Sequence, residues 1–343
     1  MRLCHVVRVT PHGCGLYETV RDLVVKEATL GHDVFIVDPE RDLAAWDRGA
    51  TIELRSRART ADILINHSGL GAALRDVGVP RIFIQHATPY HKFLREQIEK
   101  AQDYTYLEFL TKDDRYKAFV TFWPEHMAYW ELLVPKEKLH AVNAPVDLGC
   151  WRLPGGNDAG YDFGGKRGEI NIIYASPWRV GYDGFHILHA FHLFAQQVKG
   201  AKLHIYASPI VQRAMRVLYD ALSDKGILGE VCVEHKNDMR PIYYAADAVL
   251  VQCGEASRVV RESLACGAQV VMRPGNTFTP YLAEPHNISC YADAMRCAWI
   301  DQYDNKLDSM VQNRRSAERH FDSANTAKGI IAVCEKVLEE KNA

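Results

Sequence analysis

Short β-rich runs alternate with helical patterns along almost the whole chain, and this rhythm limits the possible folds more than any other feature. Between the first two runs, apolar residues recur at helical spacing over Tyr17–Leu30, and Gly31 ends the helix. The first half contains the strand-like runs Leu3–Val9, Asp33–Val37, Ile63–Asn66, Arg81–Gln85, Phe119–Phe122 and His140–Asn143. Strands separated by helices form parallel, doubly wound sheets, so this half is predicted to be an α/β domain.

A glycine-rich segment, Leu153–Gly168, interrupts the rhythm with six glycines and one proline, and we expect it to be a linker. The alternation then restarts with a strand at Ile170–Ala175 and continues to a helical tail over Leu307–Lys341. A chain of 343 residues exceeds the usual size of a single core, so two domains are expected, 1–152 and 169–324. Two such domains make a cleft, and open parallel sheets bind ligands at the carboxyl ends of their strands.

The bulk composition excludes several classes of protein. The 41 Lys and Arg residues nearly balance the 43 Asp and Glu residues, so strong binding to nucleic acid through charge alone is not expected, although a local basic groove stays open. The nine cysteines include no C-x-x-C pair, which argues against a disulfide framework or a zinc site. The N-terminus shows no signal peptide and no apolar run could span a bilayer, so we expect a cytoplasmic protein without integral membrane contact.

The segment from Ala248 to Val271, AVLVQCGEASRVVRESLACGAQVV, carries the strongest functional signal. A buried strand is expected to lead through a short polar loop into a helix from Arg258 to Cys266. Ser257 is placed to cap that helix, whose first N–H groups would favour an anion such as phosphate. Glu262 lies one turn further along, where its carboxylate can accept hydrogen bonds from two vicinal hydroxyls such as those of ribose. A structural βαβ unit with solvated Glu255 and Glu262 is the alternative.

This segment resembles the C-terminal signature of retaining GT-B glycosyltransferases, in the large family that includes sucrose and glycogen synthases (glycosyltransferase family 4). Two glutamates of that signature bracket a loop and a helix ending in E-[AS]-x-A-x-G, and Glu262-Ser-Leu-Ala-Cys-Gly267 matches the second half. The first half departs from the pattern, because the family places its glutamates eight apart. Here Glu255 and Glu262 are seven apart, and Gly254 holds the eight-apart position. The resemblance implies that Glu262 anchors the ribose and that Glu255, displaced by one residue, contacts the sugar hydroxyls.

The resemblance extends over nearly the whole chain, because further segments match in the same order. These segments are Tyr17–Pro39, Val134–Pro154, Ile172–Phe194 and Ile242–Asp247. The implied fold is GT-B, with two Rossmann-like, doubly wound domains and an interdomain cleft. In the implied arrangement, residues 1–152 form the acceptor-side domain, 153–168 the linker and 169–324 the nucleotide-sugar-binding domain. A final helix of about 325–343 returns to the first domain.

The resemblance also implies a donor site. Arg179 follows the first strand of the second domain, where an arginine can hold a diphosphate with two parallel hydrogen bonds. Asp183 stands where the family has a lysine, and Arg258 could compensate for that loss. The loop Glu234–Met239 is expected to read the base with main-chain groups. The expected nucleotide-sugar-binding residues are Gly13, Gly15, Arg179, His235, Asn237, Ser257, Arg258, Val259 and Glu262.

In the first domain, the small residues of Pro11–Glu18 would let the backbone approach a ligand closely. His86 follows a strand, at a position where the family often has a histidine near the transferred sugar. The expected catalytic residues are therefore His86, Glu255 and Arg179, with His86 orienting the sugar. The expected acceptor-binding residues are His12, Tyr17, Tyr90 and His91.

The implied reaction moves a sugar from a nucleoside diphosphate sugar, expected to be a UDP-sugar, to an acceptor hydroxyl with retention of configuration. The sequence contains no D-x-D metal motif, and no cofactor or metal is expected, because cationic side chains and a helix N-terminus can neutralise the leaving diphosphate.

One further resemblance suggests which acceptor receives the sugar. The segment Pro11–Val24 is similar to glycosyltransferases of phage genomes, some of which modify hydroxymethylated pyrimidines in DNA. The specific hypothesis is 5-hydroxymethylcytosine in phage DNA, with the host cytoplasm as the location. A saccharide or lipid-linked glycan acceptor, a GT-B nucleotide-sugar epimerase and a catalytically silent nucleotide-binding protein are the alternatives. The sequence does not indicate an oligomeric state.

Overall fold

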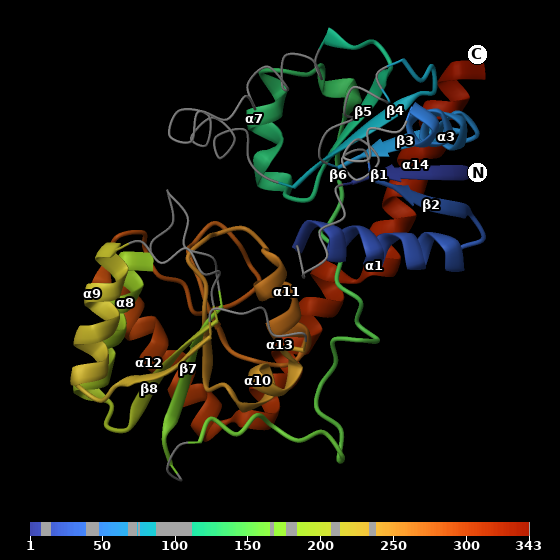
Figure 1. Cartoon of the computed structure of the whole chain (residues 1–343). Helices are drawn as coiled ribbons and strands as arrows, with labels where there is room; N and C mark the ends of the chain where they lie inside the picture. The colour runs from blue at the N-terminus through green and yellow to red at the C-terminus, as the bar shows by residue number, and fades with distance from the viewer. Residues whose placement is uncertain are drawn as a thin grey trace. The chain divides into compact units, whose positions relative to one another are not determined.

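The computed structural model describes residues 1–7, 15–38, 48–67, 74, 76–86, 112–164, 168–175, 184–206, 213–232 and 238–342. The chain forms two compact units, each of which is described by itself (Figure 1). Unit 1 comprises Met1–Pro145 and Asp322–Ala343, and unit 2 comprises Val146–Phe321. The chain therefore leaves unit 1 and returns to it for its last helix.

Unit 1 is built on a six-stranded sheet of order β2-β1-β3-β4-β5-β6, with parallel pairing between all neighbours. Its strands are β1 (Arg2–Val6), β2 (Asp33–Val37), β3 (Ile63–Asn66), β4 (Arg81–Gln85), β5 (Tyr116–Thr121) and β6 (Leu139–Ala141). Parallel neighbours need long crossover connections, which is why helical segments separate these strands in the sequence. The buried, apolar composition of β1, β3 and β4 fits a sheet that is covered on both faces.

The described helices of unit 1 are α1 (Gly15–Thr29), α3 (Arg48–Arg59), α7 (Met127–Glu131) and α14 (Ser323–Asn342), with 3-10 turns at Pro124–His126 and Lys136–Lys138. Helix α14 packs against α1. It also lies close to the segment after β6, because a Cβ at Gly329 would stand 2.9 Å from Val142 Cγ1. The Thr326 hydroxyl donates to the Asn143 carbonyl at 2.8 Å. The last helix is thus attached to unit 1 at both α1 and β6.

Unit 2 is built on a five-stranded sheet of order β11-β10-β7-β8-β9, again with parallel neighbours. Its strands are β7 (Ile170–Tyr174), β8 (Ala201–Tyr206), β9 (Leu228–Cys232), β10 (Ala248–Leu250) and β11 (Val270–Val271). Its described helices are α8 (Gly184–Gln197), α9 (Arg213–Asp224), α10 (Arg240–Ala245), α11 (Arg258–Ala265), α12 (Ile288–Asp304) and α13 (Lys306–Phe321).

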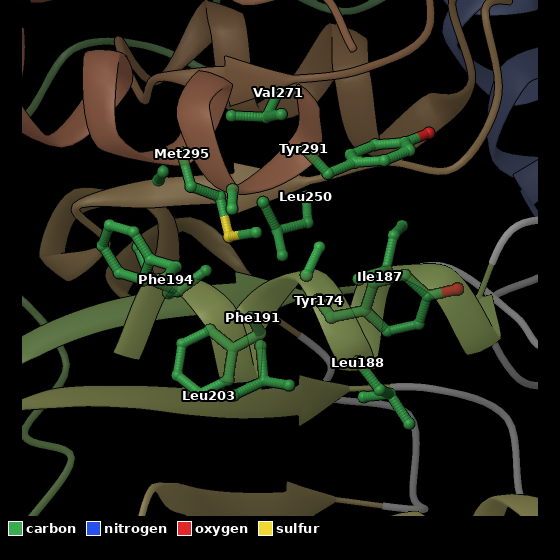
Figure 2. Close-up of a cluster of buried hydrophobic side chains, with 14 of the residues drawn as sticks. Tyr174, Ile187, Leu188, Phe191, Phe194, Leu203, Leu250, Val271, Tyr291 and Met295 are labelled. Carbon is green, nitrogen blue, oxygen red and sulfur yellow. The ribbon is translucent and has the colours of Figure 1, made fainter. Parts of the chain in front are cut away.

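The core of unit 2 forms where α8 and α12 meet the strands (Figure 2). On α8, apolar residues recur at 187, 188, 191 and 194, the spacing that places side chains on one helical face. Phe191 and Phe194 of that face are fully buried, as are Tyr291 and Met295 of α12. Burial of each such side chain contributes about 1.5–3 kcal/mol, so this packing fixes the frame that carries the loops.

The structure differs from the sequence-based expectation in several details. The predicted helical tail over Leu307–Lys341 is two helices, α13 and α14, separated at Asp322. The Asp322 carboxylate accepts from the Ala324 N–H at 2.9 Å, as an N-cap residue does. Helix α12 was not predicted, although Asn287 caps it by accepting from the Cys290 N–H. The sequence also predicts a strand over the run Val231–His235, whereas the observed strand β9 begins three residues earlier, at Leu228.

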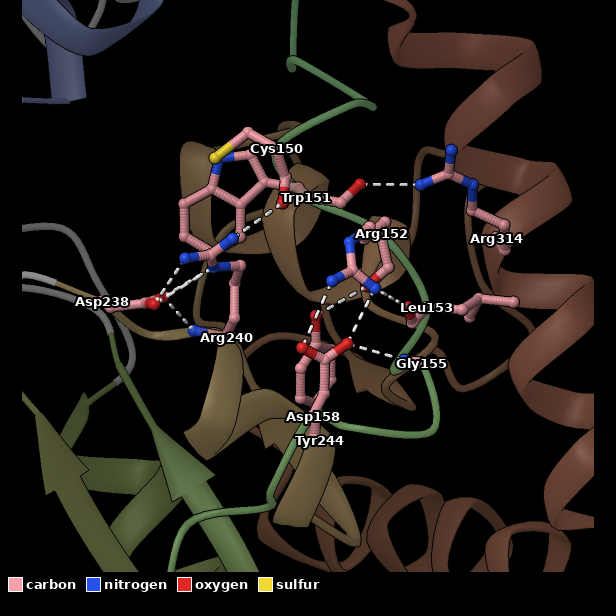
Figure 3. Close-up of polar contacts among 10 residues, drawn as sticks. All are labelled: Cys150, Trp151, Arg152, Leu153, Gly155, Asp158, Asp238, Arg240, Tyr244 and Arg314. Carbon is pink, nitrogen blue, oxygen red and sulfur yellow. Dashed lines mark hydrogen bonds and ion pairs between the residues drawn. The ribbon is translucent and has the colours of Figure 1, made fainter.

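The glycine-rich segment that we expected to be a linker is part of unit 2 and is fastened to α10 (Figure 3). Arg152 pairs with Asp158 at 2.7 Å, and the same carboxylate accepts from the Gly155 N–H at 2.6 Å. The Tyr244 hydroxyl of α10 donates to the Arg152 carbonyl at 3.0 Å. These bonds lower the pKa of Asp158, with the Gly155 N–H as the main cause.

Candidate functional site

Each sheet has one place where its strand order reverses, and open parallel sheets bind ligands outside the carboxyl ends of the strands at such a place. In unit 2, β7 leads to β8 and β9 on one side, while β10 lies on the other side of β7. In unit 1 the reversal falls between β1 and β3. The residues that follow these four strands therefore stand where a ligand is expected.

Two buried polar side chains meet at the reversal in unit 2. Tyr174 is the last residue of β7, and Gln252 lies two residues beyond β10. The Tyr174 hydroxyl donates to the Gln252 side-chain oxygen, and the two residues are 0% and 1% exposed. This bond joins the ends of the two strands and fixes the start of the polar loop that follows.

That loop runs from Cys253 to Ser257 and is held from two sides. The Glu255 carbonyl accepts from the Ser257 N–H at 2.7 Å. A Cβ at Gly254 would stand 3.0 Å from the Pro274 carbonyl oxygen, tighter than ordinary van der Waals contact. The eight-apart position is therefore closed to a glutamate unless Pro274 moves, whereas Glu255 is only partly buried.

Helix α11 begins at Arg258, as the sequence predicted, with Ser257 at the N-cap position. The Ser257 side chain does not accept from a backbone N–H of the helix. Its hydroxyl is buried without an oxygen or nitrogen partner in the described part of the chain, beside the Cys253 thiol. Burial raises the pKa of that thiol to about 12, so the thiol is neutral. Ser257 thus occupies the cap position, but its side chain does not cap the helix.

Arg258 and Glu262 form an ion pair one turn apart on α11, with side-chain exposures of only 14% and 8%. Buried Tyr243 of α10 and the Cys266 thiol lie near Glu262, and their pKa values are raised by burial first and by the Glu262 charge second. Both groups are therefore neutral and carry no charge beside the Arg258–Glu262 pair. From the sequence, we expected Glu262 to bind the ribose and Arg258 to bind the diphosphate. In the structure, the two side chains bind each other. A ligand that bonds to Glu262 would meet the Arg258 cation at the same place.

The end of α11 is fixed by a close approach to α13. Gly267 has a φ of +84°, and a Cβ there would stand 2.7 Å from Leu153 Cδ2 and 3.1 Å from Met310 Cβ. The glycine that closes the E-S-L-A-C-G segment is thus required both by its backbone conformation and by its neighbours.

Two side chains of α13 then fasten the same region. The Asn313 amide donates to the carbonyls of Gly267 and Ala268 at 3.2 and 3.0 Å. Arg314 donates to the Trp151 carbonyl at 2.7 Å (Figure 3) and to the Ala265 carbonyl at 3.2 Å. The position of Glu262 therefore depends on bonds made three to six residues further along the chain.

A second arginine pair lies directly after the segment 233–237. Arg240 at the start of α10 bonds to both carboxylate oxygens of Asp238 at 2.7–3.1 Å (Figure 3). This contact lowers the pKa of Asp238, and Arg240 also donates to the Cys150 carbonyl at 3.4 Å. The Arg240 charge is therefore balanced within unit 2.

The reversal in unit 1 carries a line of hydrogen-bonded side chains. His86 follows β4, is half-buried, and meets the Phe122 ring edge-on at 5.1 Å. Its Nε2 lies 2.8 Å from Nδ1 of His67, which follows β3. His67 Nε2 lies 2.9 Å from Nδ1 of His5 in β1, and His5 Nε2 lies 2.6 Å from the Glu27 carboxylate of α1. His86, which we expected near a ligand from the sequence, is thus hydrogen-bonded to a chain of buried side chains.

The remaining predicted residues divide into two groups. Gly15 is the first residue of α1, where it is exposed, and Tyr17 is half-buried in the first turn. Val259 is half-buried on the turn that carries Arg258. His12, Gly13, Tyr90, His91, Arg179, Asp183, His235 and Asn237 lie outside the described residues.

Four further residues belong to these sites but were not predicted from the sequence: His5, Glu27, Tyr243 and Gln252. A signal did exist for His5, because a histidine inside the apolar run LCHVV must find a polar partner once the strand is buried. A similar signal existed for Glu27, which falls four residues after Leu23 on the apolar face of the predicted helix. The identity of their partners depends on the fold and could not be taken from the pattern.

Within the described ranges, no group of three His, Cys, Asp or Glu residues is arranged to hold a metal ion. No described helix combines the length and apolarity needed to cross a bilayer.

Comparison with known proteins places the chain by its structure alone, since neither a protein-family profile nor a curated protein sequence matches it. Sucrose-phosphate synthase from Thermosynechococcus elongatus superposes with a TM-score of 0.73 at 14% identity, over 99% of both chains. Anabaena HepE, solved with UDP and glucose, gives 0.68 at 12% identity, over 100% of this chain and 99% of that one. The chain has the GT-B fold.

An α-glucosyltransferase solved with UDP and a 13-mer DNA containing an HMU base also matches, with a TM-score of 0.62 at 14% identity. The match covers 98% of this chain and 99% of that chain. Some of the glycosyltransferase structures that this chain resembles thus contain UDP with glucose, and others contain UDP with DNA. At these levels of identity the likeness concerns the fold.

Proposed function

We propose that this protein is a glycosyltransferase that takes a sugar from a UDP-sugar. The observation that carries the proposal is the buried Arg258–Glu262 pair in the first turns of α11, just beyond the strand reversal of unit 2. A carboxylate suits vicinal ribose hydroxyls, while a guanidinium and a helix N-terminus suit phosphate. The GT-B fold, shared with glycosyltransferases solved with UDP, supports the same choice.

In the proposed reaction, Glu262 holds the ribose, and Arg258 shifts from Glu262 toward the diphosphate or bridges the two. Arg179 adds a second cation at the diphosphate, and Glu255 contacts the sugar hydroxyls. Negative charge builds on the diphosphate as it leaves, so cations placed before the reaction lower the barrier without a metal ion. We propose retention of configuration, with the leaving phosphate accepting the proton of the acceptor hydroxyl.

The crowding at Gly254 supports the role of Glu255. A glutamate at position 254 would press against the Pro274 carbonyl, so an acidic side chain can enter this loop more easily one residue later. We propose that Glu255 takes over the sugar-contacting role for this reason. Glu255→Gln should then weaken binding of UDP-glucose without changing binding of UDP, which lacks the sugar.

A matched pair of substitutions tests the donor site. Both Glu262→Gln and Glu318→Gln remove the acid from an Arg–Glu pair at i, i+4 spacing in unit 2, but Glu318 is 50% exposed on α13. Loss of a charged hydrogen-bond partner costs about 1.5–3 kcal/mol, so Glu262→Gln should weaken UDP binding about 10- to 100-fold in calorimetry. Equal UDP affinity for both variants would remove Glu262 from the donor site.

The acceptor needs a separate experiment. We propose hydroxymethylated pyrimidine in DNA as the acceptor, supported by the α-glucosyltransferase solved with DNA containing an HMU base. UDP-glucose, the protein and DNA containing 5-hydroxymethylcytosine would be incubated at low and high salt, and the DNA would be analysed by mass spectrometry. Transfer that falls with salt supports a DNA acceptor. If the sugar is transferred to saccharides but not to DNA, the acceptor is a saccharide. If a changed sugar is released without any acceptor, the protein is an epimerase.

A further inference from the structure

Four polar side chains in unit 1 form one continuous hydrogen-bonded chain: Glu27, His5, His67 and His86. The contacts along it are 2.6, 2.9 and 2.8 Å, all within hydrogen-bond range. Glu27 and His5 are 0% exposed and His67 is 3% exposed, so water does not interrupt the first three members. A buried polar side chain destabilises the fold unless it is hydrogen-bonded. The unbroken bonding of these four side chains therefore suggests that they act together.

The register of the sheet explains how three distant histidines come into line. His5 of β1 is paired with Ile65 of β3, and His67 lies two residues beyond Ile65. The register between β3 and β4, continued by one residue, places His67 beside Ile84, and His86 lies two residues beyond Ile84. A shift of two residues keeps side chains on the same face of a sheet. The three imidazoles therefore run diagonally across neighbouring strands on one face, toward the carboxyl edge.

While all three imidazoles are neutral, the direction of donation must be the same along the whole chain. A neutral imidazole donates with one nitrogen and accepts with the other. If His5 is neutral and donates to Glu27, then His67 donates to His5 and His86 donates to His67 through its Nε2–H. His86 Nδ1 is then the accepting nitrogen toward whichever group meets it.

One added proton reverses the direction of donation between His5 and His86, while His5 still donates to Glu27. When His5 carries a proton on both nitrogens, it donates to Glu27 and to His67, His67 donates to His86, and His86 Nδ1 carries a hydrogen. His86 is then a donor at Nδ1 although its own ring is still neutral. The charge resides on His5, which is separated from His86 by the His67 ring.

The surroundings favour His5 over His67 as the place for that charge. The Glu27 carboxylate is fully buried, and its second oxygen has no hydrogen-bond partner among the described residues. An unbalanced buried carboxylate is unfavourable, and a protonated His5 would neutralise it. Burial, His86 and His5 hold the pKa of His67 well below its usual range, so the middle ring resists a positive charge. On α14, the Cys334 thiol beside Glu27 has its pKa raised by burial and is neutral.

We propose that Glu27, His5 and His67 form a proton relay that keeps His86 uncharged while His86 changes from acceptor to donor toward a substrate hydroxyl. A proton from solvent water forms the Nδ1–H bond of His86, and the Nε2 proton of His86 moves to His67 Nδ1. The Nε2 proton of His67 then moves to His5 Nδ1, which leaves one His5–Glu27 ion pair and no other change in charge. His86 is a candidate catalytic residue, and the other three are positioning residues.

The relay has a physical reason that rests on the proposed function. Departure of a diphosphate leaves positive charge on the sugar in the transition state. An imidazolium beside that sugar would repel it, whereas a neutral imidazole with either hydrogen-bond sense would not. The relay removes the added charge from the side chain that would contact the sugar.

Nitrogen-15 NMR of histidine-labelled protein tests the relay without any activity assay, because pyrrole-type, pyridine-type and imidazolium nitrogens differ in chemical shift. As the pH is lowered, His86 should change from the Nε2–H to the Nδ1–H tautomer while the imidazolium signature appears at His5. The result that overturns the proposal is an imidazolium at His86 or His67 before His5, or neighbouring rings with opposed tautomers.

Glu27→Gln keeps the shape of the side chain and removes the charge that stabilises protonated His5. The His86 tautomer change should move to lower pH by about one unit or more, since one unit corresponds to a tenfold change in proton affinity. The control is Glu335→Gln, which removes an exposed acid of α14 and should leave the change in place. If Glu27→Gln does not fold, His67→Gln serves instead, because severing the middle of the chain should make His86 itself become the imidazolium. An unaltered His86 titration in a folded variant refutes the relay.

Activity separates this proposal from the proposed function. Glu27→Gln should lower kcat about tenfold or more while UDP affinity stays at the wild-type value. A loss in UDP affinity equal to the loss in kcat would indicate a merely structural role. If the wild-type protein transfers no sugar, the proposed function fails, yet the tautomer experiment still decides whether the relay exists.

Discussion

Gly267→Ala should destabilise unit 2 strongly, for two reasons that can be weighed separately. The φ of +84° costs an L-residue about 1–2 kcal/mol. The new Cβ would also stand 2.7 Å from Leu153 Cδ2, which can rotate away, and 3.1 and 3.3 Å from Met310 Cβ and Cα, which cannot move without α13. Overpacking of this kind costs about 1–3 kcal/mol. The sum is about 2–5 kcal/mol, a large part of the stability of a typical domain.

Gly226→Ala is the matched control, because Gly226 lies in the same unit with a φ of +66° and nothing within 4 Å of its added Cβ. It should cost only the conformational part, about 1–2 kcal/mol. Urea unfolding followed by circular dichroism would give both values, and Leu153→Ala in the Gly267→Ala background should recover only a minor share. If the two glycine variants lose the same stability, the close approach between α11 and α13 does not constrain position 267, and the reasoning fails.

Two further predictions concern the stability of unit 2. Burial lowers the pKa of His204 from 6.5 to about 4, so the unfolded chain takes up the proton first as the pH falls. Stability present above pH 6.5 should be lost between pH 6.5 and about 4, by up to about 3 kcal/mol, and His204→Gln should lack this loss in urea unfolding at several pH values. Asn313→Ala should cost about 2–3 kcal/mol in the same assay, because it leaves buried carbonyls without donors. Asn305→Ala at the exposed end of α12 should change little.

Most strands were predictable because each is encoded by a short local run. The expected runs at Asp33–Val37, Ile63–Asn66 and Arg81–Gln85 coincide with the observed strands. Apolar, β-branched sequences of this length have few alternatives once they are buried. Some boundaries were predicted wrongly although the sequence carries a local signal for them. The break at Asp322 is one example, since its capping side chain was visible in the sequence.

The start and end of α11 were predictable for the same reason, but the partner of Glu262 was not. A glutamate four residues after an arginine can pair along the helix or can bind a ligand, and sequence spacing allows both. In the structure, Arg258 and Glu262 pair along the helix. The role of Glu262 in donor binding therefore stays a prediction, as does the role of His86.

The histidine chain was beyond sequence analysis because it depends on register across three strands. His5, His67 and His86 are separated by 62 and 19 residues, and only the two-residue offsets between β1, β3 and β4 bring their rings together. A slip of one residue in either pair would send one ring to the opposite face and break the chain. The sequence could indicate that His5 needs a partner, but not which partner it has.

The two candidate sites suit opposite charges that arise in one reaction. Transfer of a sugar from a diphosphate creates negative charge on the leaving group and positive charge on the sugar. In unit 2, Arg258 is already desolvated and paired with Glu262, so it can turn to a diphosphate without first losing a full shell of water. In unit 1, the relay would move a positive charge away from His86 to His5, which pairs with the buried Glu27 carboxylate. The Arg258–Glu262 pair and the histidine chain lie in different units. Glu262→Gln should therefore change UDP affinity without changing the His86 tautomer, and Glu27→Gln should change the His86 tautomer without changing UDP affinity. A variant of either kind that changed both properties would show that the two sites do not act through separate charges.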